Sequence, residues 1–489
     1  MNSPLPQKTD SARIWKILVC LLLLLSATLT AVISSAAQPE NPPDESHHFS
    51  LIRYLAKHPL EFPVRYERVK GEHKEYNTII HPPLYYYAMS GVLLALDPRG
   101  SSGWQGSGRM KRDARDELIM HLRRFSLFFT LAGLWGMFRL FFWLMNQQWL
   151  TPPMAAAAAL LSVFIPSTLY GNGSLNNDVF VWALWPFLAL YSGRFYCFRD
   201  KEDLFKFLFF AALMTLSKAT AWFLVAGLSI PVASVLLARP FVGKIFQNDT
   251  KTVVKSRLPG LIWAVAAAFI FIVTFLHVGR LIMVYGSPQP AYWKVYGGSI
   301  RDSQFYRIPA EGLPERSFKR LSYEAGVSLI QTASGIMAHR QTSFDSKPGN
   351  LLLMLFSGTS ALLALGLIPL FKYRWKDTCR SLFLAAVFTA VPVLFLLIFL
   401  GYCWYAYHLQ GMYGNHARYF TGYLQLFWIG VMMITSTPAC ISFWPPLVRR
   451  LLAAGAVSML GFIFCRPYYF FQYMEDGQRF MNHFMGVGL

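Results

Sequence analysis

The chain has 489 residues, of which 54% are hydrophobic and 14% charged, and its formal net charge is +20. A soluble globular protein carries about 25% charged residues, so this chain lacks the polar side chains to cover a water-facing surface. Its basic residues cluster in short loops between apolar runs, which argues against nucleic acid as a partner. Its six cysteines are scattered, which argues against a disulfide framework or a thiolate zinc site.

The N-terminal region places Lys8, Arg13 and Lys16 before the apolar run ILVCLLLLLSATLTAVISSAA. This run is longer than the core of a signal peptide, so we expect an uncleaved first span that crosses from the cytoplasm to the outside. The polar segment that follows, residues 37–122, then lies outside. Within it, PPLYYYAMSGVLLAL is too short to cross a bilayer and predicts an interfacial helix.

Further apolar runs of spanning character follow along the chain. They cover about 124–145, 153–171, 178–195, 205–220, 221–238, 259–278, 350–371, 381–402, 419–436 and 451–466. When the spans alternate in direction, the short basic loops all fall on the cytoplasmic side, and a second long loop, residues 279–348, lies outside. We therefore expect an all-α polytopic membrane protein with about 11 transmembrane helices, divided into a module of residues 1–240 and a module of residues 241–489.

Most of the unusual polar groups fall on the predicted outer face. They are Asp44, Glu45, His47, His48, His81, Asn176, Asn177, Asp178, Lys218, His416 and Arg418. Ionisable residues at the ends of spans are costly unless they are solvated or paired, so they are candidates for function. No single member is decisive, and the indication comes from their order and their common side.

The acidic and amide residues each have an ordinary structural explanation as well. Asp44 and Glu45 follow Pro-Pro and fit a solvated turn. Asn177 or Asp178 precedes an apolar run, which is typical of a helix N-cap. Both explanations stay open beside the functional one.

The cations and histidines have comparable alternatives. Lys218 and Arg418 fit side chains that extend to lipid headgroups. His81 fits a helix start before Pro-Pro, with the tyrosines behind it as an interfacial belt. His47 and His48 fit ordinary loop residues.

Taken in order, five motifs resemble the GT-C superfamily of integral-membrane glycosyltransferases. They are DESHHFSLIRYLAKHPLEFPV, HPPLYYYAMSG, SLNNDVFVWAL, LSKAT and NHARYF. The arrangement is most similar to the bacterial branch around protein O-mannosyltransferases and the lipid A aminoarabinose transferase. The resemblance covers most of residues 1–240 and reappears near 415–425, whereas 279–348 carries no matching motif.

The resemblance implies a polyprenyl-phosphate sugar as donor and a glycan, lipid or protein as acceptor, alongside membrane lipids. It also implies an inner membrane of bacterial type, with the active site on the periplasmic or external face. The family's catalytic acidic residue, just beyond the first span, matches Asp44, with Glu45 beside it. The second acidic motif matches Asn177 and Asp178.

The basic residues that hold the lipid phosphate in the family have counterparts in Lys218 and Arg418, and less directly in Arg123 or Arg124. We place His81 and His416 among the substrate-binding residues. The family carries a shorter acidic-histidine pattern where this chain has two histidines, so the choice between His47 and His48 stays open.

The chemistry of such a transfer fits these residue types. A carboxylate, here Asp44, takes the proton of the acceptor hydroxyl as a general base, which is typically worth about 10²–10⁴-fold in rate. The leaving phosphate needs positive charge, which Lys or Arg supplies. A nearby carboxylate also stabilises an oxocarbenium-like transition state, and direct displacement inverts the sugar's anomeric carbon.

Two other functional classes stay open, and so does a metal. A transporter or flippase of a lipid-linked substrate would need polar groups near the bilayer midplane, whereas here they crowd one face. A non-catalytic membrane scaffold with the same fold is the other alternative. Asp44, His47, His48, Asn177 and Asp178 offer ligands for a divalent ion, but no fixed spacing demands one, so no cofactor is firmly implied.

Overall fold

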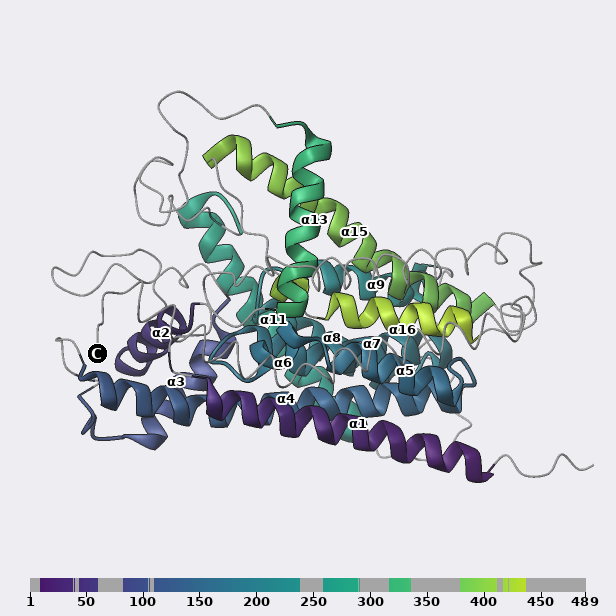
Figure 1. The fold of residues 1–489 in the computed structure, drawn as a ribbon, viewed down its shortest axis with the longest axis horizontal. Helices are drawn as coiled ribbons and strands as arrows, with labels where there is room; N and C mark the ends of the chain where they lie inside the picture. The colour runs from purple at the N-terminus through teal and green to yellow at the C-terminus, as the bar shows by residue number, and fades with distance from the viewer. Residues whose placement is uncertain are drawn as a thin grey trace, which may run out of the picture.

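The computed structural model describes residues 9–37, 39, 44–59, 82–103, 105, 110–237, 258–288, 290, 316–335, 379–410, 417–420 and 422–436. All regular structure in these segments is helical (Figure 1). The helices are α1 (Thr9–Ala36), α2 (Glu45–Lys57), α3 (Leu84–Leu96), α4 (Arg112–Asn146), α5 (Pro152–Val163), α6 (Pro166–Asn172), α7 (Asp178–Phe198), α8 (Lys201–Thr215), α9 (Ala221–Leu237), α11 (Leu258–Tyr285), α13 (Phe318–Gly335), α15 (Cys379–Gln410), η5 (Ala417–Phe420) and α16 (Tyr423–Thr435).

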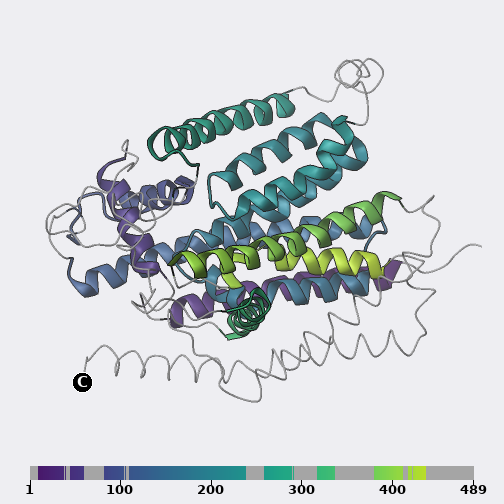
Figure 2. The ribbon, with the colours of Figure 1, turned by 90° about the horizontal axis from the view of Figure 1, so that it is seen from above.

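The long helices pack side by side as a bundle (Figures 1 and 2). Hydrogen bonds between distant segments identify its two ends. At one end the Thr151 amide, before α5, donates to the Ser436 hydroxyl, after α16, at 3.1 Å. At the other end the Gln425 amide, in α16, donates to the Thr168 hydroxyl, in α6, at 2.9 Å. We call this second end, where α1 stops and α7 begins, the site end.

Small residues let the central helices approach closely. A Cβ added to Gly133 of α4 would lie 2.7 Å from the Trp182 ring of α7, and one added to Gly193 would lie 2.6 Å from the Trp143 ring. Trp182 and Trp185 are themselves fully buried. Glycine at the contact between two membrane helices is the usual way to bring their backbones together, and here it holds α4 against α7.

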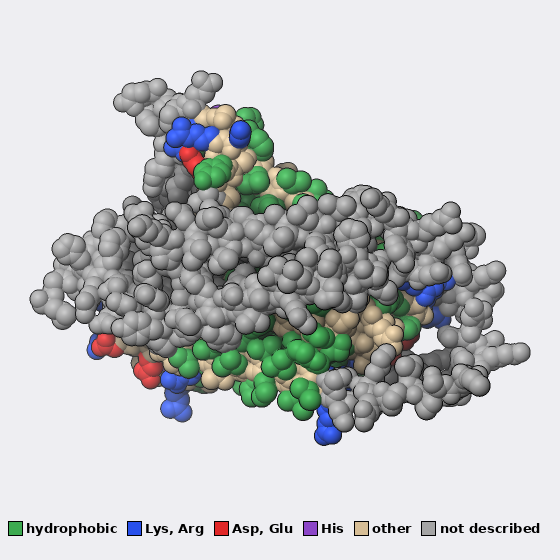
Figure 3. Space-filling model, turned by 45° about the vertical axis from the view of Figure 1, so that its right-hand side comes forward, with side chains coloured by type: hydrophobic (Ala, Val, Ile, Leu, Met, Phe, Trp, Pro, Cys, Tyr) green, Lys and Arg blue, Asp and Glu red, His purple; other side chains and the backbone are tan. Residues whose placement is uncertain are grey.

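Four described helices are long and apolar enough to cross a membrane: Arg13–Ser35, Arg112–Asn146, Gly260–Tyr285 and Arg380–Leu409. Many of their large hydrophobic side chains are exposed, as with Leu24, Phe128 and Phe269. Figure 3 shows a broad apolar patch on one face of the molecule. Exposed apolar surface of this extent is what lipid-facing helices need, and it supports the membrane class expected from composition.

The expected number of 11 spans is not confirmed. The stretches 350–371 and 451–466 lie outside the described residues. The expected span 153–171 is two helices, α5 and α6, instead of one. Pro166 explains the break, because proline has no N–H to continue the helix and favours an extended residue before it, as Ile165 is at φ −64°, ψ 119°.

The site end carries two short helices that pack on the bundle. α2 and α3 lie against each other there, at the left of Figures 1 and 2. Their apolar faces, with Ile52, Leu55 and Met89, form a cluster with Leu122 of α4. α3 is 13 residues long, so the predicted helix in PPLYYYAMSGVLLAL is confirmed, whereas its interfacial position stays a prediction.

The expected external loop 279–348 contains the helix α13. It crosses α15 steeply (Figures 1 and 2) and buries Leu321 and Ala325 against Phe399 and Cys403. α13 also contacts α6 and η5, so this helix reaches the site end.

Candidate functional site

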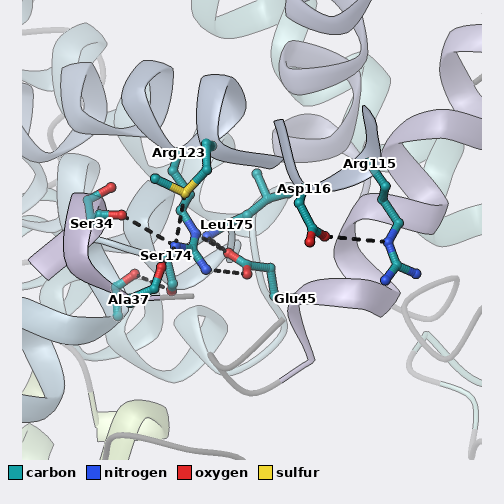
Figure 4. Close-up of polar contacts among 10 residues, drawn as sticks. Ser34, Ala37, Glu45, Arg115, Asp116, Arg123, Ser174 and Leu175 are labelled. Atoms are coloured by element: carbon teal, nitrogen blue, oxygen red, sulfur yellow. Dashed lines mark hydrogen bonds and ion pairs between the residues drawn. The ribbon is translucent and has the colours of Figure 1, made fainter. Parts of the chain in front are cut away.

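A fully buried ion pair joins the first polar segment to the bundle. Both oxygens of the Glu45 carboxylate accept hydrogen bonds from the Arg123 guanidinium, from Nε to Oε1 at 2.6 Å and from Nη2 to Oε2 at 2.5 Å (Figure 4). Neither side chain has any solvent exposure. A two-pronged Arg–carboxylate contact is the strongest geometry for such a pair.

The pair also binds the backbone of two other segments. Arg123 Nη1 donates to the carbonyl of Ala37 at 2.5 Å and to that of Ser34 at 3.3 Å, at the end of α1. The Leu175 amide donates to Glu45 Oε1 at 2.9 Å. Four parts of the chain therefore meet here: α1, α2, α4 and the turn before α7. This placement favours an anchoring role for Glu45 and Arg123 over proton transfer or phosphate binding. Arg124, the next residue of α4, is exposed.

Asp44 lies next to this anchor in an unusual backbone conformation. Its φ of 64° and ψ of 10° are left-handed, a region that residues other than glycine seldom adopt. It precedes the first turn of α2, and its carbonyl accepts from the His48 amide at 2.9 Å, but its side chain makes no capping hydrogen bond. Asp44 is partly exposed, whereas Glu45 is buried.

A second buried ion pair lies where α7 begins. The Lys218 ammonium, in the turn between α8 and α9, donates to Asp178 Oδ1. Both side chains are about 5% exposed. Lys218 Nζ also lies 5.4 Å from the centre of the Tyr419 ring, which places η5 beside this pair. The expected meeting of Asp178 with Lys218 is thus seen, in a buried contact.

Asn177 holds the same two turns together. Its Nδ2 donates to the carbonyl of Ser217 at 3.3 Å, and the Asp178 amide donates to Asn176 Oδ1 at 2.9 Å. Asn177 precedes α7 as its N-cap residue but makes no side-chain capping bond. Asn177 therefore occupies the N-cap position expected from the sequence, but its side chain bonds the neighbouring turn instead of capping α7.

Tyr85 of α3 packs against the start of α7, with its ring centre 6.3 Å from that of Phe180. Burial raises the pKa of its phenol well above the ordinary value of 10.0, and the charges of Glu45 and Asp178 raise it further, against an opposing effect of Ser126. Tyr85 is fully buried, and the start of α3 is held to the α8–α9 turn by a bond from the Leu84 amide to the Leu216 carbonyl at 3.1 Å. This bond and the packing of Tyr85 join α3 to the same turns that carry the second ion pair.

The sequence interpretation missed Tyr85, Tyr86 and Tyr419 as parts of this region. The run HPPLYYY was interpreted as an interfacial belt, and its spacing carries no sign of which tyrosine turns inward. One signal was available: Tyr85 and Met89 are four residues apart, so a helix places both on the same face, and that face could have been predicted to turn inward.

The predicted histidines and Arg418 differ in how far the structure describes them. His48 is buried, and its Nδ1 shares a hydrogen bond of 2.8 Å with the Tyr86 hydroxyl, whereas His47 is half-buried. His81 and His416 lie outside the described residues, and of Arg418 only the backbone, in η5, is described. In the described part of the chain, no three His, Cys, Asp or Glu side chains gather as metal ligands.

No family model matches the chain, and no curated protein matches it either. Among solved structures, the chain is similar to the crystal structure of ArnT from Cupriavidus metallidurans bound to undecaprenyl phosphate. The two share 13% sequence identity with a TM-score of 0.36, over 86% of this chain and 77% of that one.

Proposed function

We propose that the chain is a membrane glycosyltransferase of GT-C type, which moves a sugar from a polyprenyl-phosphate donor to an acceptor hydroxyl. One observation carries this proposal. Carboxylates and a cation from segments far apart in the chain, Asp44, Asp178 and Lys218, gather at one end of a bundle with lipid-facing helices. Such a site meets a phosphate at the membrane surface while the lipid tail stays among apolar helices.

Asp44 is the carboxylate we assign as general base. Glu45 is less suited, because buried donors hold both of its oxygens. The left-handed backbone of Asp44, beside the Glu45–Arg123 anchor, is the kind of strained conformation that clusters at functional sites.

Lys218 is the residue we assign to the donor phosphate, with Arg418 as its partner from η5. An ammonium group has three N–H donors, so it can hold the Asp178 carboxylate and a phosphate oxygen together. Tyr419, the residue after Arg418, lies over Lys218, which places the backbone of Arg418 near the same point.

The proposed transfer needs no cofactor, because each bond broken is matched by a bond formed. The acceptor oxygen attacks the anomeric carbon as the bond from that carbon to the phosphate oxygen breaks. Asp44 takes the hydroxyl proton, and polyprenyl phosphate leaves with its charge held by the cations. Attack opposite the leaving group inverts the anomeric centre.

The test is a transfer assay with the full chain in lipid vesicles. Radiolabelled polyprenyl-phosphate sugars of several kinds are supplied together with cell-envelope extract as the acceptor, and the release of polyprenyl phosphate is measured. We expect release from at least one donor, and none from Asp44→Asn at an unchanged melting temperature. Wild-type activity in Asp44→Asn would remove this residue from the mechanism, and no release from any donor would overturn the proposed function.

A further inference from the structure

Two buried oxygen atoms at the start of α7 accept no hydrogen bond from the described residues. They are Oδ1 of Asn177 and Oδ2 of Asp178. Asn177 is fully buried and Asp178 is 3% exposed. Buried polar atoms are almost always hydrogen-bonded, and leaving an acceptor unpaired is unfavourable, so two neighbouring exceptions need an explanation.

The orientation of both groups is fixed by the bonds that they do make. Asn177 Nδ2 donates to the Ser217 carbonyl, which can only accept, so the amide oxygen must be the atom without a partner. Asp178 Oδ1 accepts from Lys218, which leaves Oδ2 as the other oxygen of the same carboxylate. The turn thus presents two acceptors whose positions are set by α8 and α9.

Acceptor atoms select for one kind of ligand chemistry. The oxygens of a phosphate are also acceptors and carry negative charge, so they would be repelled by Asp178. Hydroxyl or amino groups supply the missing donors, and a sugar carries several hydroxyl groups. Because Oδ1 and Oδ2 belong to one carboxylate, a phosphate on Lys218 and a donor group at Oδ2 would be neighbours, as they are in a sugar phosphate.

We propose that Asn177 and Asp178 form the sugar subsite of the donor, in which Asn177 Oδ1 and Asp178 Oδ2 accept hydrogen bonds from hydroxyl or amino groups of the sugar. This inference rests on the proposed function. The two adjacent turns then have different roles: Lys218 binds the phosphate, and the start of α7 selects the sugar.

The experiment compares two lipids of equal charge on the purified full chain in detergent. One is a polyprenyl-phosphate monosaccharide, drawn from a panel of sugars, and the other is polyprenyl methyl phosphate, which has the same phosphodiester without a sugar. Dissociation constants are measured for the wild type, Asn177→Ala, Asp178→Asn and Thr168→Val. Thr168→Val is the matched control, because it removes a buried hydrogen bond at the same end of the bundle, to Gln425.

We expect the wild type to bind at least one sugar ester about tenfold more tightly than the methyl ester, the factor that one good hydrogen bond to a charged group supplies. Asp178→Asn puts an amide, which can donate, in place of the acceptor Oδ2 and also removes the charge that pairs with Lys218. Asn177→Ala removes the acceptor Oδ1 and the bond to the Ser217 carbonyl but keeps the ion pair. Both should abolish the preference for the sugar, and Asn177→Ala should leave methyl-ester binding within about twofold because it keeps the Asp178–Lys218 ion pair. Asp178→Asn changes the charge beside Lys218, so for this variant only the ratio of the two affinities is compared, and Thr168→Val keeps the preference.

The possible failures are distinct. If neither lipid binds the wild type, the donor class is wrong and the proposed function falls with it. If both lipids bind but Asn177→Ala keeps the sugar preference, the two oxygens serve ordered water only, and the sugar subsite is overturned while the donor class stands. Equal weakening of both lipids by Asn177→Ala would also overturn the sugar subsite.

Discussion

The anchor between Glu45 and Arg123 makes the sharpest prediction about stability. Arg123→Met removes the guanidinium and leaves the Glu45 carboxylate buried without the arginine's charge, while the Leu175 amide still donates to it. Breaking one partner of a buried ion pair costs about 3–5 kcal/mol, because the other charge is left uncompensated. Since Arg123 also binds the carbonyls of Ala37 and Ser34, we expect the loss to lie in the upper part of that range.

The double variant Glu45→Gln with Arg123→Met separates charge from packing. The neutral amide can still accept from the Leu175 amide, so most of the loss should be recovered. Arg124→Met is the matched control, because its side chain is exposed on the same helix, and a change there is worth about 0.5 kcal/mol or less. The readout is the melting temperature of each purified variant in one detergent.

Two results would refute this reasoning. One is a double variant no more stable than Arg123→Met, because an uncompensated charge would then not be the cause of the loss. The other is equal damage from Arg124→Met and Arg123→Met, because burial would then not distinguish the two arginines.

Three further predictions concern the site end. Lys218→Met should lower the melting temperature and weaken binding of polyprenyl methyl phosphate at least tenfold, with Lys218→Arg recovering part of both; unchanged lipid binding would count against the phosphate role. Arg418→Ala should weaken donor binding more than acceptor binding, as measured from separate Michaelis constants, and equal effects would argue against a phosphate contact. Hydrogen bonds from Ser102 and Ser101 hold the pKa of the Asp97 carboxyl well below its ordinary 3.8. A lowered pKa stabilises the fold above that value and loses the effect as pH falls through the folded-state pKa, so the melting-temperature gap between wild type and Asp97→Asn should be widest above pH 4 and narrow below it.

Much of the helical framework could be predicted from hydropathy and length. α1, α7, α9, α11, α15 and α16 occupy stretches that were expected to be spans, because in a bilayer every backbone group must be bonded within its own helix. The boundaries were less predictable. α4 begins at Arg112 and not near the expected start at 124, because polar residues continue a helix beyond the lipid without any apolar signal.

The location of the site could be predicted from the sequence, but which charged residues form ion pairs there could not. Sequence order indicated that Asp44, Glu45, Asp178 and Lys218 share one face, and the structure brings Asp178 to Lys218. That Glu45 pairs with Arg123 depends on which face of α4 turns inward, and charge pattern alone does not distinguish Arg123 from Arg124. The inward turn of Tyr85 is set by the packing of α3 on α4, which is equally absent from local sequence.

The most direct test of the central claim is an experimental structure of the full chain with polyprenyl phosphate bound. We expect the phosphate at the site end, within hydrogen-bond distance of Lys218 Nζ and on the same side of the bundle as Asp44. A phosphate bound at the opposite end, where α1 and α15 begin near Arg13 and Arg380, would contradict the account.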